Sequence, residues 1–534
     1  MEEFDYVVIG GGPGGCVSAS RLSEDQAVTV ALIEAGPDRR GFFADCTAAG
    51  TLLNVPRKTP SNWAFNSTPQ PGLNGRRAYQ PYGRGLGGGS AINVLMYMRG
   101  HRGDYDEWAG MGNLGWSYAE VLPYFRKSEN NQTHRNSFHG NDGPVWVEEL
   151  RTDNPYHGII MRACREAGLP FNPDFNGEEQ EGYNLVQVMM KNGERYHTGK
   201  AFIHPHLGTR ANLRLFADTE CARILFEGKR AVGVEVVHDG RRRRIDVRRE
   251  VIVAGGGFLS PKILMLSGVG PGTELQARGI PVIHDLPGVG RNLMDHLDFI
   301  LGYHVPGDPS LFAFSPIAAL QLAKAYRRWR QERRGMLATN YAEVTGFMRL
   351  TPDSPKPEIQ YEFVFGIQVD HGRKIVSRHG ISCHVLLLHP RSRGTVTLAT
   401  PDYRDEPLLD LNYLSHPDDL KTIVEGTKRT DAIFKTPTLR PLVKRAMFTE
   451  HCRTDDEWAE VIRNRAGTNY HPVGTCKMGD GPDAVVDARL KVHGVHGLRV
   501  IDSSIMPKIV GGNTMAPTIM IGEKGAAMIR EDWR

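Results

Sequence analysis

The first residues of the chain follow the hydrophobic pattern of a βαβ unit. An apolar run at 6–9 predicts a buried strand, and glycines crowd the turn at 10–15. A helical pattern covers about 16–23, and a second apolar run starts at Ala27. A strand, a tight turn, a helix and a second strand in this order predict two parallel strands joined by a helix.

Two later segments have equally clear periodicity. Short alternating runs between Leu213 and Gly257, separated by turn residues, predict a β-meander that ends in a buried strand. The segment 117–129 predicts a helix, because Ser117 can serve as its N-cap and Glu120 follows at the spacing of a capping box.

The pattern changes twice along the chain. Glycine, proline and asparagine crowd 56–90, which we expect to be extended coil. From about 300 to 465, longer alternating strands and amphipathic helices favour an antiparallel sheet, and glycine-rich sequence returns from about Asn469. We therefore predict a mixed α/β fold, in which a Rossmann-like domain formed by 1–155, 200–300 and 466–534 carries an inserted substrate domain formed by 156–199 and 301–465.

The composition is that of a globular protein, with 534 residues of which 40% are hydrophobic. A formal charge of +4, from 65 basic and 61 acidic residues, gives no electrostatic argument for a nucleic-acid partner. The seven cysteines include no C-x-x-C pair, so we expect neither a disulfide framework nor a thiol redox motif, and a reducing compartment such as the cytoplasm fits best.

Membrane contact is the open question about location. The N-terminus lacks the basic and apolar pattern of a signal peptide, and no apolar run approaches the ~20 residues of a membrane span, so we expect a soluble or at most peripheral protein. In 317–334, however, Leu322, Tyr326 and Trp329 share one helical face among many arginines. A buried-face helix is the favoured interpretation, and a lipid-facing helix at the inner face of the cytoplasmic membrane is the alternative. The sequence carries no signal for oligomeric state.

A dinucleotide-binding motif lies in the first turn. Gly10, Gly12 and Gly15 form G-x-G-x-x-G between a strand and a helix, and Glu34 closes the second strand, where a carboxylate can accept both hydroxyls of an adenosine ribose. A flexible glycine loop is the alternative, and an acid at position 34 disfavours a 2′-phosphate. Regular βα units do not continue after Glu34, and the later β-meander suits an elongated FAD better than NAD.

A second glycine-rich stretch carries a family resemblance. Gly87–Gly89, followed by Ser90 and Asn93, can present backbone N–H groups to an anion, although a flexible linker has the same composition. The whole stretch from Pro81 to Trp108 resembles the first signature of the glucose–methanol–choline (GMC) family of FAD-dependent alcohol oxidoreductases. Further segments are similar to family segments in the same order, with Gly257 as one departure: 256–270, 286–298, 389–415, YHPVGTCKMG and 498–526.

The resemblance implies a catalytic pair. His471 occupies the position of the family's active-site histidine, and Asn513 that of its partner, which is histidine or asparagine in relatives. Because asparagine does not titrate, we expect His471 to act as the base and Asn513 to hold the substrate oxygen, and we expect the other histidines to be structural. A metal site that pairs His471 with Cys476, His451 and Cys452 matches no zinc spacing, so no metal is expected.

The resemblance also implies non-covalent FAD. Gln80, Pro81 and Tyr82 stand where relatives with covalent FAD carry a histidine. A helix with Pro517 in its first turn, Thr514 or Asn513 as its cap and its end near Arg530 would point its N-terminus at the flavin. Together with the glycine motif, the resemblance assigns these residues to the cofactor: Gly10, Gly12, Gly15, Glu34, Ala35, Arg84, Gly88, Ser90, Asn93, Val94, Leu95, Met96, Cys221, Asp502, Ser503, Asn513 and Thr514.

The expected reaction is oxidation of a primary alcohol to an aldehyde, with electrons passed to a quinone-type acceptor. An oxidase that produces H₂O₂ is one alternative, and a lyase or light-driven decarboxylase on the same scaffold is another. A disulfide reductase is excluded because a second G-x-G-x-x-G and a cysteine pair are missing. Apolar or aromatic residues at 94–97, at Tyr341 and in the strands of 360–390 favour aliphatic or aryl alcohols over sugars, and we expect Glu343 to be a solvated surface group.

Overall fold

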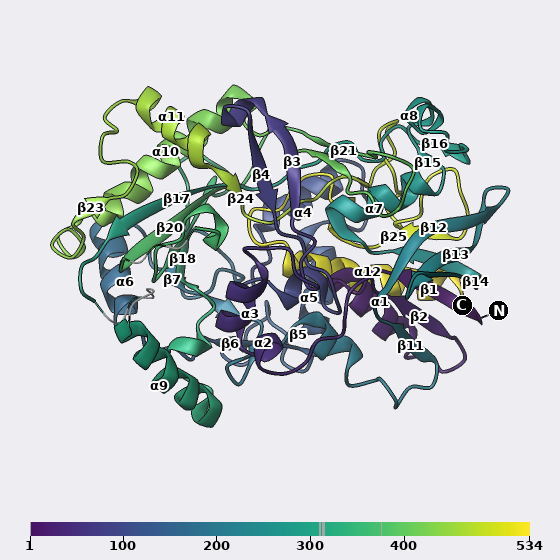
Figure 1. Cartoon of the computed structure of the whole chain (residues 1–534), viewed down its shortest axis with the longest axis horizontal. Coiled ribbons are helices and arrows are strands. Elements are labelled where there is room, and N and C mark those ends of the chain that lie inside the picture. Colours follow the sequence, from purple (N-terminus) through teal and green to yellow (C-terminus); the bar gives the residue numbers. More distant parts are fainter. Residues whose placement is uncertain (1, 309–310, 312–315, 375, 377) are drawn as a thin grey trace.

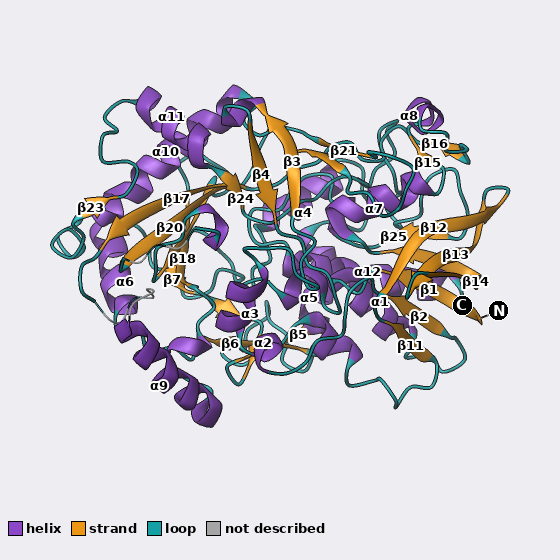
Figure 2. Cartoon of the chain, in the orientation of Figure 1, coloured by secondary structure: helices purple, strands orange, loops and turns teal. Residues whose placement is uncertain are grey.

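The computed structural model describes residues 2–308, 311, 316–374, 376 and 378–534. Two large sheets lie at opposite ends of the molecule, the first on the right and the second on the left of Figure 1. Figure 2 shows the two sets of strands in orange, with helices and long loops between and around them. The two sheets and their helices confirm the predicted mixed α/β class, whereas the domain limits given above remain a proposal.

The first sheet has seven strands. Six follow the order β11-β2-β1-β14-β13-β12, and β25 pairs with the C-terminal end of β14. The predicted βαβ unit is present as β1, α1 (Pro13–Leu22) and β2, and β1 and β2 run parallel. The strands are β1 (Glu2–Ile9), β2 (Val30–Ile33), β11 (Leu213–Phe216), β12 (Thr219–Glu227), β13 (Arg230–His238), β14 (Arg241–Val253) and β25 (Leu498–Val500).

The predicted meander is correct for β12, β13 and β14, which pair antiparallel in chain order. Its first run is different, because β11 leaves the meander and pairs parallel with β2 at the opposite edge of the sheet. The backbone groups of β2 are thereby satisfied on both sides, which a buried strand requires.

Three helices meet at one buried carboxylate under the first sheet. Glu523, on α12 (Met515–Asp532), has no exposed surface and accepts hydrogen bonds from the Arg21 guanidinium of α1 at 2.7–2.9 Å. Lys127, on α5 (Tyr118–Ser128), approaches the same carboxylate at 3.0 Å. An ionised carboxylate is buried at low cost only when it is paired in this way. The α5 helix begins with the predicted capping box, in which the Ser117 N–H donates to Glu120 at 3.0 Å.

The second sheet is antiparallel in every pairing, in the order β23-β17-β20-β19-β18-β7, with β24 beside β17. Helices α6 (Tyr156–Glu166), α10 (Pro417–Phe434) and α11 (Asp455–Arg465) contact its strands. The strands are β7 (Gly182–Leu185), β17 (Leu297–His304), β18 (Ala342–Met348), β19 (Ile359–Val364), β20 (Gly380–Leu387), β23 (Arg445–Ala446) and β24 (Gly467–Thr468).

Side chains of β19 alternate between two environments, as the two-residue period of a strand requires. Ile359, Tyr361 and Phe363 belong to the apolar core that the sheet shares with α10. Glu362 and Val364 point the other way and line a cavity. The sheet therefore turns the Glu362 carboxyl toward the interior of the molecule.

The segment 56–90, expected to be coil, contains a hairpin. Strands β3 (Phe65–Gln70) and β4 (Arg76–Gln80) pair antiparallel, and Asn74 and Gly75 in their turn both have positive φ. These two residues close the loop 71–75, which begins with the short helical turn Pro71–Leu73, so the connection is longer than the two-residue hairpin turn that Asn-Gly favours.

Helix α9 (Pro316–Glu332) projects from the lower left of Figure 1. Side-chain burial on this helix is described from Gln321 onward. No helix in the described part of the chain combines the length and the apolar composition needed to cross a membrane.

Candidate active site

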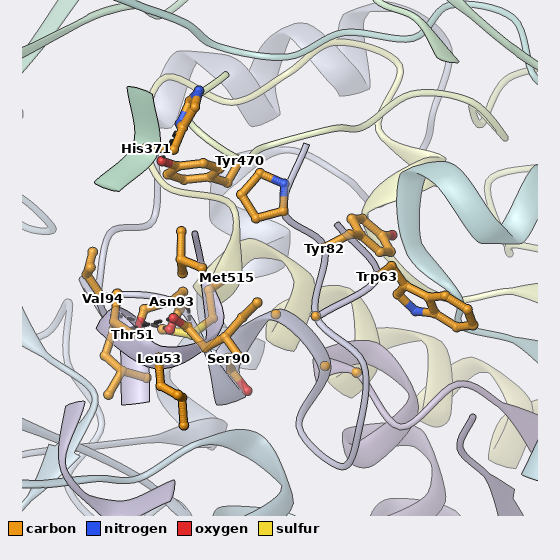
Figure 3. A pocket seen from close by; sticks show the side chains of 18 of the residues that line it. Thr51, Leu53, Trp63, Tyr82, Ser90, Asn93, Val94, His371, Tyr470 and Met515 are labelled. Carbon is orange, nitrogen blue, oxygen red and sulfur yellow. Dashed lines mark hydrogen bonds between the residues drawn. The ribbon is translucent and has the colours of Figure 1, made fainter. Parts of the chain in front are cut away.

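A cavity of about 1440 Å³ is lined by residues of both sheets. The turn after β1 and the end of β2 contribute from the first sheet, and β19 and β20 contribute from the second. Figure 3 shows Tyr470 and His371 on one wall, Tyr82 on another, and a cluster around Ser90 and Asn93 on a third.

The turn between β1 and α1 needs glycine for two different reasons. Gly10 has φ +106°, and a Cβ there would lie 2.4 Å from the carbonyl oxygen of Ala254; a Cβ on Gly15 would lie 1.8 Å from the carbonyl oxygen of Gly10. At Gly12 the nearest atom is 3.9 Å away, and the residue lines the cavity. Gly10 and Gly15 thus allow the turn to form, whereas Gly12 leaves an open cradle at a helix N-terminus, where backbone N–H groups favour a phosphate.

Glu34 directly follows β2 and is almost completely buried at the cavity wall. Its carboxylate accepts hydrogen bonds from the backbone N–H groups of Gly11 and Gly36 at 2.7 Å and of Gly85 at 2.9 Å. Burial raises the pKa of this carboxyl, and the three N–H groups act against that rise. A carboxylate has about four lone-pair sites, so one stays available for a ligand hydroxyl.

The second glycine stretch packs directly on the first. The Gly87 N–H donates to the carbonyl oxygen of Gly11 at 2.7 Å, and a Cβ on Gly88 would lie 2.7 Å from the Cα of Gly12. The Ser90 hydroxyl closes the turn by donating to Gly87 at 2.6 Å. The flexible-linker interpretation is therefore wrong for this stretch.

Most residues assigned to the cofactor are brought together at the cavity. Gly15 and Arg84 do not line it: Gly15 packs beneath the first turn, and the Arg84 guanidinium lies 4.8 Å over the Trp63 ring and donates to the carbonyl of Ala35. Those that do line it are Gly10, Gly12, Glu34, Ala35, Gly88, Ser90, Asn93, Val94, Leu95, Met96, Cys221, Asp502, Ser503, Asn513 and Thr514.

Asp502 lines the cavity, and its carboxylate accepts three hydrogen bonds from within the protein. It accepts from the Gly256 N–H at 2.8 Å, from the Ser260 hydroxyl at 2.5 Å and from the Ser504 N–H at 2.7 Å. Its main structural effect is to join the start of α7 (Gly256–Leu266) to the loop after β25.

Helix α12 begins at the cavity. Thr514 is its N-cap residue, Pro517 lies in its first turn as predicted, and Thr514, Met515 and Thr518 line the cavity wall. The partial positive charge of a helix N-terminus therefore acts on this end of the cavity.

His471 and Asn513 meet at the same end. The Asn513 Nδ2 lies 3.4 Å from the His471 Nε2, and the His471 backbone N–H donates to Asp295 at 2.8 Å. Tyr413 donates its hydroxyl to the same carboxylate. Burial raises the pKa of Asp295 to about 6 and lowers the pKa of His471 to about 3, below the near-neutral value expected of the base. The reason is that His471 is enclosed and that, among the residues the structure describes, no carboxylate contacts its ring, so the neutral imidazole is favoured.

A hydrogen-bond chain connects this pair to β19. Gln360 Nε2 donates to the Asn513 Oδ1 at 3.2 Å and to the Glu362 Oε1 at 2.9 Å. Because its oxygen is held by Gln360, the Asn513 amide must turn its N–H groups toward His471.

Two titratable residues face each other across β19 and β20. Glu362 pairs with His384 in the sheet register, and both line the cavity. Burial raises the pKa of Glu362 to about 7. Burial also opposes a positive charge on His384, but Asp298, 2.6 Å away, outweighs it and raises the His384 pKa.

Sequence reasoning missed this polar wall and the environment of His471. His371 and His384 line the cavity, and His296 lies against His471, although these histidines were expected to be structural. Alternation of polar and apolar residues in 358–364 and the pair Asp295-His296 are the signals that could have found them.

Glu343 is not the surface group that was expected. It is buried and accepts hydrogen bonds from Thr152 at 2.8 Å and from Thr339 at 2.5 Å, and it also contacts His157. Its strand β18 is an inner strand of the second sheet, between β19 and β7.

Over the described ranges, no group of three or more His, Cys, Asp or Glu side chains is placed to hold a metal ion. Cys476 is fully buried, and its backbone N–H donates to the carbonyl of Ser504.

Comparison with known sequences identifies the family. Residues 4–298 match the N-terminal part, and residues 390–522 the C-terminal part, of the family described as GMC oxidoreductase. The chain belongs to the GMC oxidoreductases. The resemblance seen in the sequence is thus confirmed, and it makes this chain an FAD-dependent oxidoreductase of the class that acts on alcohols, EC 1.1.

Similar GMC oxidoreductases span almost the whole chain. An alcohol dehydrogenase [acceptor] of Pseudomonas putida is 40% identical over 98% of this chain and 95% of its own length. The mitochondrial choline dehydrogenase of Mus musculus is 40% identical over 99% of this chain and 90% of its own length. The formate oxidase of Aspergillus oryzae RIB40, whose FAD modification has been studied, superposes with a TM-score of 0.91 at 26% identity over 99% and 98% of the two chains.

The residues present fit FAD. The space at Gly12, which a Cβ would fill, lies at a helix N-terminus and suits a phosphate of the cofactor. The buried Glu34 carboxylate has a lone pair left for a ribose hydroxyl. Met515 and Asn93, at the start of α12 and after the second glycine turn, also line the cavity.

Proposed function

We propose that this GMC oxidoreductase converts a primary alcohol to the aldehyde, with His471 as the base and Asn513 as the group that holds the substrate oxygen. FAD, when bound, supplies the hydride acceptor. The Asn513 Nδ2–H donates to the substrate hydroxyl oxygen, and the His471 Nε2 accepts the hydroxyl proton. The observation that carries this proposal is the neutral, buried imidazole beside an amide donor at the end of the cavity.

Replacement of His471 by alanine tests the reaction. We expect the variant to keep FAD. The rate at which alcohols bleach its flavin under anaerobic conditions should fall by a factor of about 10²–10⁴, the usual contribution of a positioned base. His496→Ala is the matched control, because His496 is exposed and does not line the cavity. Bleaching by His471→Ala at the wild-type rate would refute the assignment, and the absence of bleaching in the wild type would favour a lyase or a light-driven decarboxylase.

We propose that FAD is held without a covalent bond. At the positions where a histidine link would stand, the half-buried Tyr82 donates its hydroxyl to the carbonyl of Gly255 at 2.8 Å, and Gln80 lies beside Tyr413. Acid precipitation should release the flavin into the supernatant; flavin that stays with the pellet contradicts this.

A quinone is the proposed electron acceptor, and oxygen is the alternative. The support is the Pseudomonas putida relative, whose name specifies an acceptor. Alcohol-dependent reduction of a soluble quinone, without steady H₂O₂ formation in air, is the expected result. H₂O₂ in step with aldehyde would make the enzyme an oxidase.

The cavity favours, among primary alcohols, those with a second hydrogen-bonding or cationic group. Glu362 and His384 replace the wholly apolar wall that the sequence suggested. A substrate panel of aliphatic alcohols, benzyl alcohol and choline, assayed with an artificial acceptor, tests this preference. Choline, which carries a cationic group, should be oxidised with a higher kcat/KM than the purely apolar alcohols.

We also propose a cytoplasmic protein whose cavity mouth touches the membrane. Five exposed apolar side chains, here called the apolar rim, line the cavity from α2 (Phe42–Asp45), α3 (Thr47–Asn54) and α9. They are Phe43, Leu52, Leu53, Leu322 and Tyr326, between 39% and 57% exposed. Lys324, Arg327 and Arg330 are exposed on the same helix and would meet anionic headgroups. A rim in lipid would let an apolar quinone reach the cavity.

Trp329 does not belong to that surface. It is 1% exposed, its Nε1–H donates to the carbonyl of Gly193 at 3.1 Å, and it packs against Phe42. The favoured buried-face interpretation is thus correct for Trp329, whereas Leu322 and Tyr326 are exposed.

Vesicle co-sedimentation tests the rim. Wild-type protein should pellet with anionic vesicles, and Leu322→Asp combined with Tyr326→Asp should lower the bound fraction several-fold. Leu114→Asp is the control, because Leu114 is 82% exposed and lies outside the cavity lining. Equal binding of all three proteins, or no binding by the wild type, counts against membrane contact.

A further inference from the structure

A second histidine lies directly behind the proposed base. The Nδ1 atoms of His296 and His471 are 2.9 Å apart, and the two rings meet edge to face. His296 is fully buried and does not line the cavity, so it cannot touch a substrate there. Any effect that it has on the reaction must pass through His471.

The other nitrogen of His296 fixes its protonation. His296 Nε2 lies 3.0 Å from the carbonyl oxygen of Leu388, which can only accept a hydrogen bond. The proton must therefore be on His296 Nε2. Burial and the neighbouring His471 keep the pKa of His296 well below its ordinary value, so the ring is neutral and carries no second proton.

The protonation of His471 follows from the same contact. Because the His296 Nδ1 has a lone pair and no proton, the 2.9 Å contact is a hydrogen bond only if the His471 Nδ1–H donates it. A neutral His471 then has its lone pair on Nε2, the atom that faces Asn513 and the cavity. In the other tautomer two lone pairs would face each other at this distance, and Nε2 would carry a proton.

The backbone reinforces the arrangement. Asp295, the residue before His296, accepts the His471 backbone N–H at 2.8 Å, and the Asn469 N–H donates to the His296 carbonyl at 3.0 Å. Asp295 and His296 therefore hold both the backbone and the ring of His471.

We propose that His296 is a positioning residue which, through the Leu388 carbonyl, sets the Nδ1–H tautomer of His471 and keeps its Nε2 free to accept the alcohol proton. This inference rests on the proposed role of His471. It assigns His296 the task that a carboxylate performs behind the histidine of hydrolase triads, with a neutral partner instead.

Two variants separate a tautomer effect from a structural one. His296→Leu removes the acceptor, so His471 samples both tautomers; the rate of anaerobic flavin reduction at saturating alcohol should fall several-fold, in proportion to the lost fraction of the Nδ1–H form, while KM and FAD content stay near the wild-type values. The loss should persist across pH 6–9, because raising the pH does not change the ratio of two neutral tautomers. In His296→Asn the amide oxygen lies near the position of Nδ1 and can accept the bond, so most of the rate should return.

A spectroscopic readout does not depend on activity. In protein labelled with ¹⁵N-histidine, the His471 signals, identified by their loss in His471→Gln, should show a protonated Nδ1 and an unprotonated Nε2 in the wild type, and a mixture in His296→Leu. An Nε2–H form in the wild type overturns the inference, as does flavin reduction by His296→Leu at the wild-type rate. If no alcohol bleaches the wild type, the proposed function fails, and the tautomer assignment is still decided by the NMR spectrum.

Discussion

Glu362 has a carboxyl group that titrates near neutral pH inside the cavity. Burial raises its pKa from the ordinary 4.5 to about 7, and Gln360 connects it to Asn513. When His471 accepts a proton it becomes a cation, which an ionised Glu362 stabilises and a protonated Glu362 does not. The ionisation of Glu362 therefore enters the energetics of the proposed proton transfer.

The pH dependence of flavin reduction should reveal this group. We expect the anaerobic rate of the wild type to rise several-fold between pH 6 and pH 8, as Glu362 loses its proton. In Glu362→Gln the rise should disappear and the rate should stay near the low-pH level. Glu149→Gln, a change at an exposed position, should keep the wild-type profile. An unchanged rise in Glu362→Gln would show that another group titrates.

Among individual residues, the sequence predicted only those that belong to a motif or to a segment that resembles the family. His471 and Asn513 stand in recognisable segments, and the fold brings them to 3.4 Å. His296 and Gln360 are 175 and 153 residues away from the partners they contact, so only the tertiary fold makes them neighbours. The pKa of His471 depends on burial, which no local pattern specifies.

Among the secondary-structure elements, the two glycine turns carry the cofactor site. They contact each other through Gly88 and Gly12, so neither can move without the other. Yet their glycines differ in purpose, since some are needed by the turn and others leave space for a ligand. That difference can be tested by adding a single methyl group.

Gly12→Ala should fold normally and bind FAD at least about 10-fold more weakly, because the added Cβ meets no atom closer than 3.9 Å and occupies the cradle. Gly15→Ala should lower the free energy of unfolding, because its Cβ would lie 1.8 Å from a carbonyl oxygen. Thermal unfolding and equilibrium dialysis of flavin distinguish the two effects.

Gly158→Ala provides the control for a methyl group added elsewhere. Its Cβ would meet nothing within 4 Å on α6, so stability should rise by roughly 0.5–1 kcal/mol, the helix preference for alanine, with unchanged FAD affinity. Loss of folding in Gly12→Ala, or wild-type FAD affinity, would contradict the cradle.

Elements with strong local signals were predicted well. The βαβ unit, the capping box at Ser117 and the antiparallel run β12–β14 follow from periodicity and capping alone. The hairpin β3–β4 was missed because its strands pack against distant residues, as Gln70 does when it donates to Asp410. β11 was misplaced because a short apolar run does not reveal which edge it will join.

At the scale of the whole molecule, the buried Glu362 carboxyl lowers the free energy of unfolding as the pH rises. A carboxyl whose folded pKa is raised favours folding below its unfolded pKa, and this contribution is lost as the pH rises through the folded pKa. For Glu362 the window runs from about 4.5 to about 7, and the shift corresponds to about 3 kcal/mol at 1.36 kcal/mol per pKa unit.

Replacing this carboxyl should therefore stabilise the protein most at high pH. Relative to wild type, Glu362→Gln should gain on the order of 3 kcal/mol in free energy of unfolding between pH 5 and pH 8, measured by urea unfolding at matched flavin content. A constant difference between the two proteins across that range would show that Glu362 does not titrate in the fold.

Both ends of the chain meet in the first sheet. β1 is its central strand, β25 from near the C-terminus pairs with β14, and α12 packs on α1 through Arg21 and Glu523. Figure 1 shows the N- and C-termini next to each other. The glycine turn that forms the cofactor cradle is therefore supported by a helix about 500 residues further along the sequence. Folding of this domain, and with it formation of the flavin site, depends on contacts of very long sequence separation, which form slowly.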